Sequence, residues 1–321
     1  MNPGRDTHGG TTPVQEKVRT LFGLLRDCVL CPRKCRVDRT AGERGFCGLA
    51  GEAMVSAALP HHGEEPVISG TGGAGTIFFS SCNLKCIFCQ NYQISHIPGG
   101  RPLGTGALAK EMMVLEEKQC HNIEAVTATP HVPFLAAAVV HARMQGMALP
   151  VVYNCGGYEN PEVVKLLEGS VDIYLPDFKY GDDENAHFFS GVRDYVTHAA
   201  TAIAEMIRQV GDDIEVEGGI ARRGIIIRHL VLPGHVENSL KVLALIERHF
   251  PLSVPLSIMS QYTPVPALTS GRVPGRRVTR KEYERVVNEA MDRGFEYLFV
   301  QDVDERHIAP DFGDDAPFHW N

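Results

Sequence analysis

The sequence predicts an α/β protein, a partial (βα)6 TIM-like barrel with a small N-terminal cysteine-rich metal module. From Gly75 onward, short apolar runs rich in β-branched residues alternate with segments of helical period, the pattern of repeated βα units. Polar residues follow almost every apolar run, as expected where the carboxyl ends of parallel strands form a site. Seven of the nine cysteines fall in two groups before residue 90. We therefore expect residues 1–60 to hold a tail, a short helix and the metal module, residues 61–302 the barrel, and residues 303–321 a C-terminal tail.

The order of the elements follows from the apolar runs and from helix caps. Residues 14–25 predict a short amphipathic helix near the N-terminus. Asn160 followed by Pro161 is typical of a helix start, and Thr279 with Glu282 forms a capping box for the last helix. Most strand candidates are continuous apolar runs, as expected for strands that helices cover on both faces. Seven strands are predicted, at residues 76–80, 123–127, 150–154, 171–176, 224–231, 254–259 and 296–301.

The composition argues against several classes of protein. With 321 residues and 44% hydrophobic content the chain can bury a large core. The formal net charge is −8, the sequence pI is near 6.0 and basic residues form no block, which argues against nucleic acid as a partner. No apolar run reaches membrane-spanning length, and the first residues lack the apolar core of a signal peptide. We expect a cytoplasmic protein, because clustered cysteines that bind metal suit a reducing compartment.

The most informative motif follows the first predicted strand. Cys82, Cys86 and Cys89 stand in the run Ser-Ser-Cys-Asn-Leu-Lys-Cys-Ile-Phe-Cys-Gln-Asn-Tyr. A [4Fe–4S] cluster is normally held by four cysteines, so a loop that offers three leaves one iron open to an added ligand. An open iron predicts catalysis rather than electron storage. The alternatives are a structural zinc knuckle and an incidental group of thiols.

This cysteine spacing, with an aromatic residue before the last cysteine, resembles the signature of the radical S-adenosylmethionine (SAM) superfamily. Residues 75–92 resemble the cluster segment of pyruvate formate-lyase activating enzymes and their uncharacterised homologues, and the similarity extends over residues 63–301. The resemblance implies a barrel of the radical SAM type, in which the open iron of a [4Fe–4S] cluster binds SAM. One electron then cleaves SAM to methionine and a 5′-deoxyadenosyl radical, which abstracts hydrogen from a substrate. The implied partners are a low-potential electron donor, flavodoxin or ferredoxin, and a glycyl radical enzyme.

By the same resemblance, residues near later strand ends lie beside bound SAM. Lys179 matches the family's Asp-Leu-Lys and Arg228 its Ile-Arg-x-x-x-x-Pro-Gly, and a fixed cation suits the SAM carboxylate beside an anionic cluster. Asn154 matches a position that contacts the ribose, and Phe88 one that packs beside adenine. The structural alternatives are an ion pair of Asp177 with Lys179 and a core role for Phe88.

The sequence departs from the family after the second strand. The activating enzymes carry Gly-Gly-Glu there, whereas residues 127–131 of this chain read Thr-Ala-Thr-Pro-His. Thr127 and Thr129 can supply hydroxyl or carbonyl acceptors for the SAM amino group. The Gly-Gly-Tyr-Glu run that ends at Glu159 follows the third strand instead, and we do not assign that role to it.

Four cysteines upstream, Cys28, Cys31, Cys35 and Cys47, lie within twenty residues, among glycines that permit tight turns. Four thiolates in so short a segment predict a closed metal site. Zinc would staple a segment too short to build its own core, whereas an auxiliary iron–sulfur cluster would relay electrons. The spacing does not match the C-x2-C-x2-C-x3-C run of ferredoxins, so the sequence leaves zinc and a second cluster open.

The sequence thus predicts a radical SAM enzyme, with a protein glycyl residue as the substrate that the resemblance implies. A second enzyme hypothesis is radical modification of a small metabolite or peptide at Gln261 and Tyr262, which follow the sixth strand at the same rim and are expected to contact cofactor or substrate. A third hypothesis is a non-catalytic iron–sulfur electron-transfer or scaffold protein, against which the open iron argues. Cys155 and Cys120 are expected to be buried structural thiols, although Cys155 can also donate hydrogen in radical chemistry.

Overall fold

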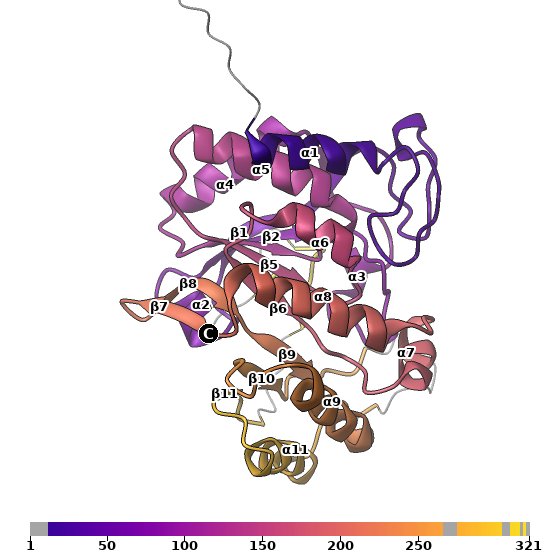
Figure 1. Ribbon diagram of the computed structural model, residues 1–321, viewed down its shortest axis with the longest axis vertical. Coiled ribbons are helices and arrows are strands. Elements are labelled where there is room, and N and C mark those ends of the chain that lie inside the picture. The colour runs from indigo at the N-terminus through magenta and orange to yellow at the C-terminus, as the bar shows by residue number, and fades with distance from the viewer. Residues whose placement is uncertain (1–11, 266–274, 304–308, 315–316, 319–321) are drawn as a thin grey trace, which may run out of the picture.

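The computed structural model describes residues 12–265, 275–303, 309–314 and 317–318, and the structural statements below concern these residues. Figure 1 shows a central sheet with helices packed against it and a smaller sheet beside it. The helices are α1 (Pro13–Gly23), α2 (Pro66–Ser69), α3 (Tyr92–Ser95), α4 (Thr105–Glu117), α5 (Val132–Met144), α6 (Pro161–Leu167), α7 (Asp183–Ser190), α8 (Tyr195–Val210), α9 (Val236–His249) and α11 (Arg280–Asp292), with short 3₁₀ turns at Arg39–Ala41 and Thr129–His131. The strands are β1 (Ala53–His61), β2 (Ala74–Phe79), β3 (Arg101–Leu103), β4 (Ile123–Val126), β5 (Val151–Cys155), β6 (Ile173–Pro176), β7 (Ile214–Glu217), β8 (Ile220–Ile225), β9 (Ile227–Leu230), β10 (Leu256–Met259) and β11 (Leu298–Val300).

Eight strands form the main sheet in the order β3-β1-β2-β4-β5-β6-β8-β7. Neighbours from β2 through β4, β5 and β6 to β8 are parallel, whereas β1 pairs antiparallel with β2 and β3, and β7 pairs antiparallel with β8. Every residue of β2, β4 and β6 is buried, as expected for parallel strands that other elements cover on both faces. The predicted α/β class is confirmed.

A second sheet continues the parallel series in the order β11-β10-β9. The fifth predicted strand, residues 224–231, is divided between the two sheets, because β8 ends at Ile225 and β9 begins at Ile227. A single bridge between Asp177 and Arg228 links β9 to the end of β6, and the Phe178 amide donates to the Arg228 carbonyl at 2.7 Å. All seven predicted strands are therefore present, one of them in two pieces.

Three strands were not predicted, and all three pair antiparallel. β1 contains Pro60, which cannot donate an amide hydrogen and argues against a strand. It is accommodated because β3 pairs only with residues 53–55 of β1, so that Pro60 lies beyond this pairing.

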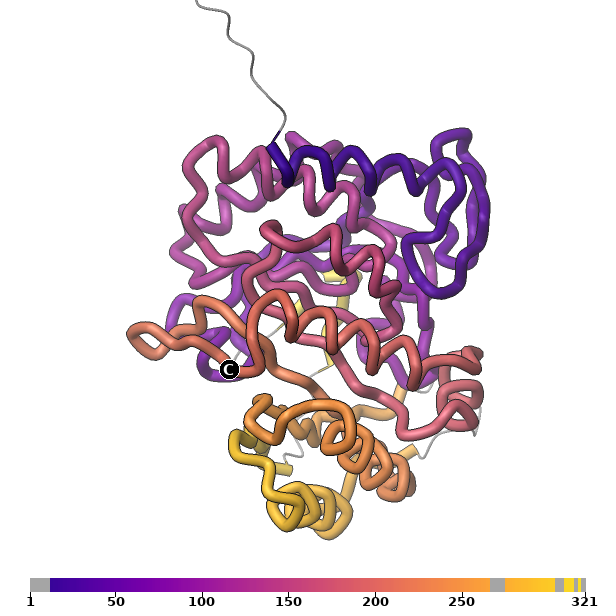
Figure 2. Tube along the Cα trace, viewed as in Figure 1, coloured from indigo at the N-terminus to yellow at the C-terminus, as the bar shows by residue number. Residues whose placement is uncertain are grey.

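Figure 2 shows the chain passing through a group of loops after α1 before it enters the sheet. Because β1 spans residues 53–61, it crosses the boundary expected at residue 60 and ties the cysteine-rich segment to the main sheet.

Both predicted terminal helices are confirmed. Thr12 caps α1 in a capping box, and Phe22 packs edge to face on Phe134 of α5 with ring centroids 5.1 Å apart. Thr279 and Glu282 form the expected capping box of α11. Local caps thus start the first and the last described helix at the residues that the sequence indicates.

The described part of the C-terminal tail packs onto β2. Phe78 stacks on Phe318 with ring centroids 5.3 Å apart and meets Phe312 edge to face, also at 5.3 Å. Residues 304–308, 315–316 and 319–321 of the expected tail, like residues 1–11 of the expected N-terminal tail, lie outside the described residues. The tail therefore contributes aromatic rings to one side of the sheet.

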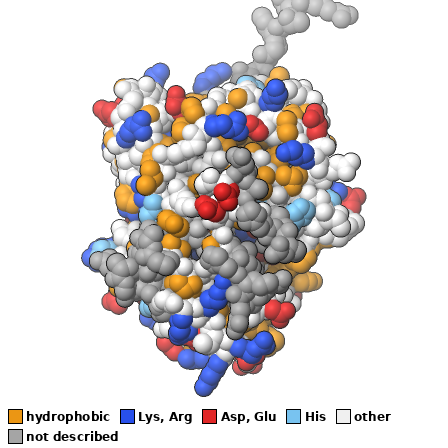
Figure 3. All heavy atoms as spheres, turned by 180° about the vertical axis from the view of Figure 1, so that it is seen from behind, with side chains coloured by type: hydrophobic (Ala, Val, Ile, Leu, Met, Phe, Trp, Pro, Cys, Tyr) orange, Lys and Arg blue, Asp and Glu red, His pale blue; other side chains and the backbone are white. Residues whose placement is uncertain are grey.

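The surface of the molecule carries charges of both signs. On the face shown in Figure 3, Lys and Arg side chains are interspersed with Asp and Glu. Across the described part of the chain, no helix combines the length and apolar character that a membrane crossing requires.

The loops after β5 and β6 are held together by Tyr195. Its hydroxyl lies 3.0 Å from the carbonyl oxygens of Gly156 and Asp177 and accepts from the Lys179 amide at 2.8 Å. Gly157 lies in the first of these loops with a φ of 78°, and a Cβ atom there would stand 2.1 Å from the Asp177 carbonyl oxygen. This close approach of two backbones requires glycine.

We expect Gly157→Ala to lower the free energy of unfolding much more than Gly146→Ala. Both glycines have a positive φ, which costs an alanine about 1–2 kcal/mol. Only Gly157 meets backbone, since a Cβ atom at Gly146 has nothing within 4 Å. The total loss at Gly157 should reach about 3 kcal/mol or more. Urea unfolding followed by circular dichroism measures the free energy of unfolding of both variants. Equal losses of stability in the two variants would contradict the close approach of the two backbones at Gly157.

Candidate active site

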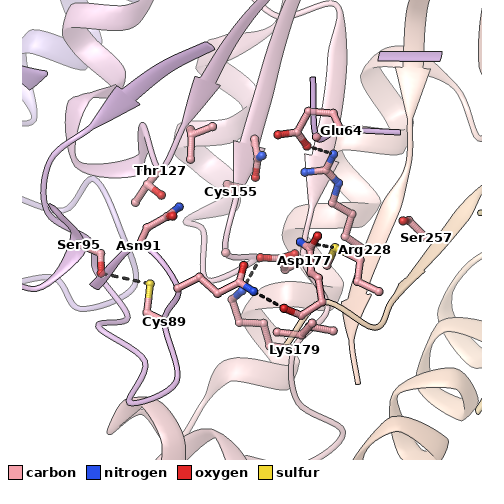
Figure 4. A pocket seen from close by; sticks show the side chains of 18 of the residues that line it. Glu64, Cys89, Asn91, Ser95, Thr127, Cys155, Asp177, Lys179, Arg228 and Ser257 are labelled. Atoms are coloured by element: carbon pink, nitrogen blue, oxygen red, sulfur yellow. Dashed lines mark hydrogen bonds and ion pairs between the residues drawn. The ribbon is translucent and has the colours of Figure 1, made fainter. Parts of the chain in front are cut away.

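A cavity of about 650 Å³ lies at the carboxyl ends of β2, β4, β5 and β6 and extends to β9, β10 and β11. Ligand pockets of proteins commonly have such volumes. Figure 4 shows Cys89 and Ser95 on one side of it and Arg228 with Glu64 on the other. Nine of the predicted site residues line this cavity: Cys82, Cys86, Phe88, Cys89, Thr127, Asn154, Lys179, Arg228 and Gln261.

The three cysteines of the loop after β2 accept hydrogen bonds. Ser95 Oγ donates to Cys89 Sγ at 3.2 Å and Ser190 Oγ to Cys86 Sγ at 3.0 Å, while the backbone amide two residues after Cys82 donates to its Sγ at 3.3 Å. Such donors favour the thiolate form. Burial nevertheless raises the pKa of Cys82 to about 11 and that of Cys89 to about 12. The loop can therefore hold anionic sulfur once a metal supplies the compensating charge.

The spacing of these sulfur atoms separates two kinds of metal site. A tetrahedral zinc with Zn–S bonds of about 2.3 Å brings its sulfur ligands to about 3.8 Å from one another. Among the described residues, the one set of three ligand atoms that all lie within 4.8 Å of one another is formed by His61, Glu64 and Glu124, and the cysteines form no such set. A [4Fe–4S] cluster places each cysteine on a different iron, so its ligands stand farther apart. The loop therefore fits a cluster better than a zinc knuckle.

Lys179 and Asp177 form an ion pair at the end of β6, as drawn in Figure 4. Burial lowers the pKa of Lys179, but Asp177 and Cys86 raise it well above its usual range, so the side chain stays protonated. The positive charge of Lys179 lowers the pKa of Cys82 and of Cys89, against the rise that burial causes. The structural ion pair expected as the alternative is thus present, and its ammonium acts on the cysteine loop.

Arg228 lies across the cavity from Cys89 and binds two carboxylates. Its guanidinium donates to Glu64 at 2.5 Å and to Glu65 at 3.0 Å. Burial raises the pKa of Glu64, but Arg228 and His61 lower it to about 2, so this carboxylate is ionised. The expectation that an arginine inside an apolar strand needs a partner is confirmed. The partners are carboxylates, and a contact of Arg228 with SAM stays a prediction.

Thr127 and Asn154 line the wall between these two ends. The Asn154 amide donates to Glu124 at 2.8 Å, and the Thr76 hydroxyl donates to the other carboxylate oxygen at 2.8 Å. Burial and the charge of Glu64 raise the pKa of Glu124 to about 7. Thr127 has a φ of 59°, a conformation that is rare for a β-branched residue and common at functional sites. The sequence analysis missed Glu124, although a lone acidic residue in the run Ile-Glu-Ala-Val was a usable signal.

Two residues predicted at the rim are not among those that line the cavity. Thr129 is buried in a 3₁₀ turn, and its hydroxyl donates to Glu159 at 2.6 Å instead of facing the cavity. Tyr262 is fully buried in the core. Phe88 does line the cavity, but it also packs edge to face on Phe189 with ring centroids 5.4 Å apart, so its core role is real.

The remaining cysteines occupy three places. A smaller cavity is lined by Cys28, Cys31, Cys35 and Cys47. Asn83, from the loop after β2, lines it as well. Cys155 is buried in the wall of the large cavity, as Figure 4 shows. Cys120 is buried among core side chains and is not one of the residues that line the large cavity.

Replacing Glu159 tests the burial of its carboxyl group. Burial raises the pKa of Glu159 from 4.5 to about 7, so unfolding releases a proton and wild-type stability falls as the pH rises from the lower value to the higher. Glu159→Gln removes this loss and should stabilise the protein by about 3 kcal/mol at pH 8 but little at pH 4.5. Urea unfolding at both pH values measures the difference.

The matched control for this test is Glu117→Gln, at the exposed end of α4. We expect Glu117→Gln to leave the free energy of unfolding unchanged at both pH values. A gain from Glu159→Gln that is equal at pH 4.5 and pH 8 would contradict a raised pKa.

Comparisons with known proteins give the family. Residues 76–246 match the model of the radical SAM superfamily. The uncharacterized protein MJ0674 of Methanocaldococcus jannaschii is 30% identical over 290 residues, which cover 88% of this chain and 80% of that protein. The uncharacterized protein MJ0808 of the same organism is 24% identical over 295 residues, which cover 86% of this chain and 81% of that protein.

Solved structures resemble this one more distantly. Streptococcus suis SuiB bound to S-adenosylmethionine has a TM-score of 0.48 and 11% identity, over 69% of this chain and 48% of SuiB. The native anSMEcpe with bound AdoMet has a TM-score of 0.43 and 13% identity, over 66% of this chain and 57% of that protein. The chain thus spans about half the length of these two proteins. Because the family match covers more than half of its residues and contains the three-cysteine loop, the chain belongs to the radical SAM superfamily.

Proposed function

We propose that this chain is an enzyme that cleaves SAM reductively and uses the resulting radical to abstract hydrogen from a substrate in the large cavity. One observation carries the proposal: three cysteines from a single loop face the same cavity as the polar ends of four parallel strands. A [4Fe–4S] cluster and SAM are the cofactors typical of the superfamily. On this proposal, strands β2 to β11 form the partial (βα)6 barrel of the radical SAM type, with its site at the carboxyl rim.

Each residue of the cysteine loop has a distinct part in this proposal. The bound cluster supplies the one-electron cleavage of SAM to methionine and a 5′-deoxyadenosyl radical. Cys82, Cys86 and Cys89 hold three of its irons, and Ser95 and Ser190 donate hydrogen bonds to the sulfur atoms. Hydrogen bonds to sulfur tune the reduction potential of a cluster.

The wall between the cysteine loop and Arg228 offers the groups that SAM requires. The Asn154 amide and the Thr127 hydroxyl can bind the ribose or the amino group, and Gln261 lines the same space. Phe88 offers an apolar ring for adenine. The Lys179 ammonium suits the SAM carboxylate, provided that it exchanges part of its contact with Asp177.

The Arg228 end of the cavity is the proposed place of the substrate. Glu64 and Glu65 line this end, where they bind Arg228 and His61, so a substrate meets carboxylate oxygens. This end favours a substrate with a cationic group or with several hydrogen-bond donors. The backbone amides of a glycyl residue in a partner protein, to which the sequence resemblance points, satisfy this condition. A small metabolite or peptide with an amine satisfies it equally, and the assays below separate the two.

We expect the anaerobically reconstituted protein to form methionine and 5′-deoxyadenosine from SAM after reduction with dithionite. Cys86→Ala should reduce this formation to background, because it removes one of three iron ligands. Cys120→Ala changes a buried cysteine that is not among the cavity-lining residues and should keep the wild-type rate. Chromatography of both products measures the effect. If the wild-type protein forms neither product, the non-catalytic alternative is correct.

Electron paramagnetic resonance identifies the substrate class. With SAM, reductant and a glycyl radical enzyme from the same genome, the wild-type protein should produce a glycyl radical signal if a protein glycine is the substrate. The signal should be lost with Cys86→Ala and kept with Cys120→Ala. The absence of a signal with every encoded glycyl radical enzyme would contradict this substrate and leave the small metabolite or peptide.

A further inference from the structure

The segment between α1 and β1 folds around its four cysteines. The Cys28 amide donates to the Val37 carbonyl at 3.0 Å, and the Arg36 amide donates to the Cys28 carbonyl at 3.1 Å, which closes a tight loop. Lys34 and Arg36 take left-handed conformations with φ values of 42° and 62°. This strained loop brings the sulfur atoms to one small cavity, lined by Cys28, Cys31, Cys35 and Cys47.

The spacing of the sulfur atoms argues for a cluster rather than a single ion. As in the loop after β2, no three of the four sulfur atoms all lie within 4.8 Å of one another in the described part of the chain. Zinc with four thiolates at about 2.3 Å needs sulfur atoms about 3.8 Å apart and leaves no space between them. The four cysteines line one cavity, and their sulfur atoms do not show the close grouping that a single zinc requires. Thiolates on four separate irons stand farther apart than thiolates on one zinc, which agrees with the lack of a close group of three.

A buried guanidinium supplies an independent indication that the four cysteines hold an anionic metal centre. Arg39 is 1% exposed and lines the cysteine cavity. Its Nε donates to the Ala50 carbonyl at 2.9 Å and its Nη1 to the Pro130 carbonyl at 2.8 Å, whereas Nη2 has no hydrogen-bond partner among the described residues. A buried donor without an acceptor costs about 1–3 kcal/mol. An anionic group between the cysteines would accept this hydrogen bond and balance the charge.

Three hydrogen bonds connect this cavity to the segment that carries Cys82. The Ser81 hydroxyl donates to the Cys47 carbonyl. Arg33 Nε donates to the Asn83 carbonyl at 2.6 Å, and Lys85 Nζ donates to the Phe46 carbonyl at 3.0 Å. The two cysteine sets are therefore neighbours, joined by a path of one hydrogen bond and one peptide unit from Cys47 to Cys82.

The surface around the upstream cysteines is basic. Residues 26–48 contain six Lys and Arg, of which Arg39 is buried, against three Asp and Glu, in a chain whose net charge is −8. Arg26, Lys34 and Arg44 are exposed there, and the ring of Phe46 is 41% exposed beside them. A positive surface favours the encounter with an acidic protein.

We infer that Cys28, Cys31, Cys35 and Cys47 hold an iron–sulfur cluster, which relays electrons from an acidic one-electron donor of the flavodoxin or ferredoxin type. The donor loses one electron, the upstream cluster gains it and then passes it to the cluster at Cys82, Cys86 and Cys89. There the electron is consumed when the sulfonium C–S bond of SAM breaks, and no proton is transferred. The relay rests on the proposed function, whereas the presence of the upstream cluster does not.

Metal analysis of a variant that cannot bind the SAM cluster tests the site by itself. The full-length protein with Cys82→Ala, Cys86→Ala and Cys89→Ala, reconstituted anaerobically, should contain about four irons and four sulfides per chain. Its reduced electron paramagnetic resonance signal should not respond to SAM. About one zinc per chain with no iron, or no metal at all in a variant whose circular dichroism is native, would overturn the assignment.

The converse variant tests the relay. With Cys31→Ser and Cys47→Ser, the protein should keep about four irons and a signal that responds to SAM. Formation of 5′-deoxyadenosine driven by reduced flavodoxin should fall about tenfold or more, whereas formation driven by titanium(III) citrate, which reaches the SAM cluster directly, should persist. Cys120→Ala is the control and should change neither rate. An unchanged rate with flavodoxin would overturn the relay, and a lack of product from wild-type protein with both reductants would instead contradict the proposed function.

Discussion

A buried cluster of three charged side chains connects the two sheets beside the cavity. Arg228 belongs to β9 of the smaller sheet, whereas Glu64 and Glu65 lie just before α2, which packs beside β8 of the main sheet. The three side chains are exposed by 10% or less. Removing one member of such a group strands a buried charge, at a cost of about 3–5 kcal/mol. The far wall of the cavity therefore depends on direct ion pairs between residues that are distant in sequence. The backbone bridge between Asp177 and Arg228 is the second connection between the two sheets.

The same constraint divides the cavity into two chemical environments. At the cysteine end, hydroxyl and amide donors and the Lys179 ammonium face sulfur. At the other end, Glu64 is ionised, and its charge helps to keep the pKa of Glu124 near neutrality. The two ends of the cavity thus present different groups, an ammonium paired with Asp177 near the sulfur atoms and carboxylates paired with Arg228 and His61 opposite. On the proposed function, a radical formed at the first end would meet its substrate at the second.

Most of the residues predicted from the sequence line one cavity because parallel strands place their carboxyl ends on one rim. Cys82, Asn154 and Lys179 each follow an apolar run, and the structure brings all three to one cavity. The fold was harder to predict where strands pair antiparallel or where one apolar run is divided between two sheets. The run from Gly224 to Val231 is apolar except for Arg228 and His229, so no local signal marks the break between β8 and β9.

Side-chain direction and distant partners were beyond the sequence. Thr129 is only two residues from Thr127, yet a 3₁₀ turn directs it to Glu159. Arg228 meets carboxylates more than 160 positions earlier in the chain, and only the folded topology brings them together. Likewise, only the structure shows that Arg39 Nη2 is buried without a hydrogen-bond partner among the described residues.

The C-terminal segment has a practical consequence for work on this protein. Pro310 and Phe318 belong to the wall of the large cavity, and the Phe318 ring lies 4.5 Å from that of His61. An affinity tag inserted close behind Phe318 would therefore stand beside this wall. Helix α1 contributes none of the residues that line the cavity. A tag placed ahead of α1 is thus attached to an element that takes no part in the site, and it is the better choice for measurements of turnover.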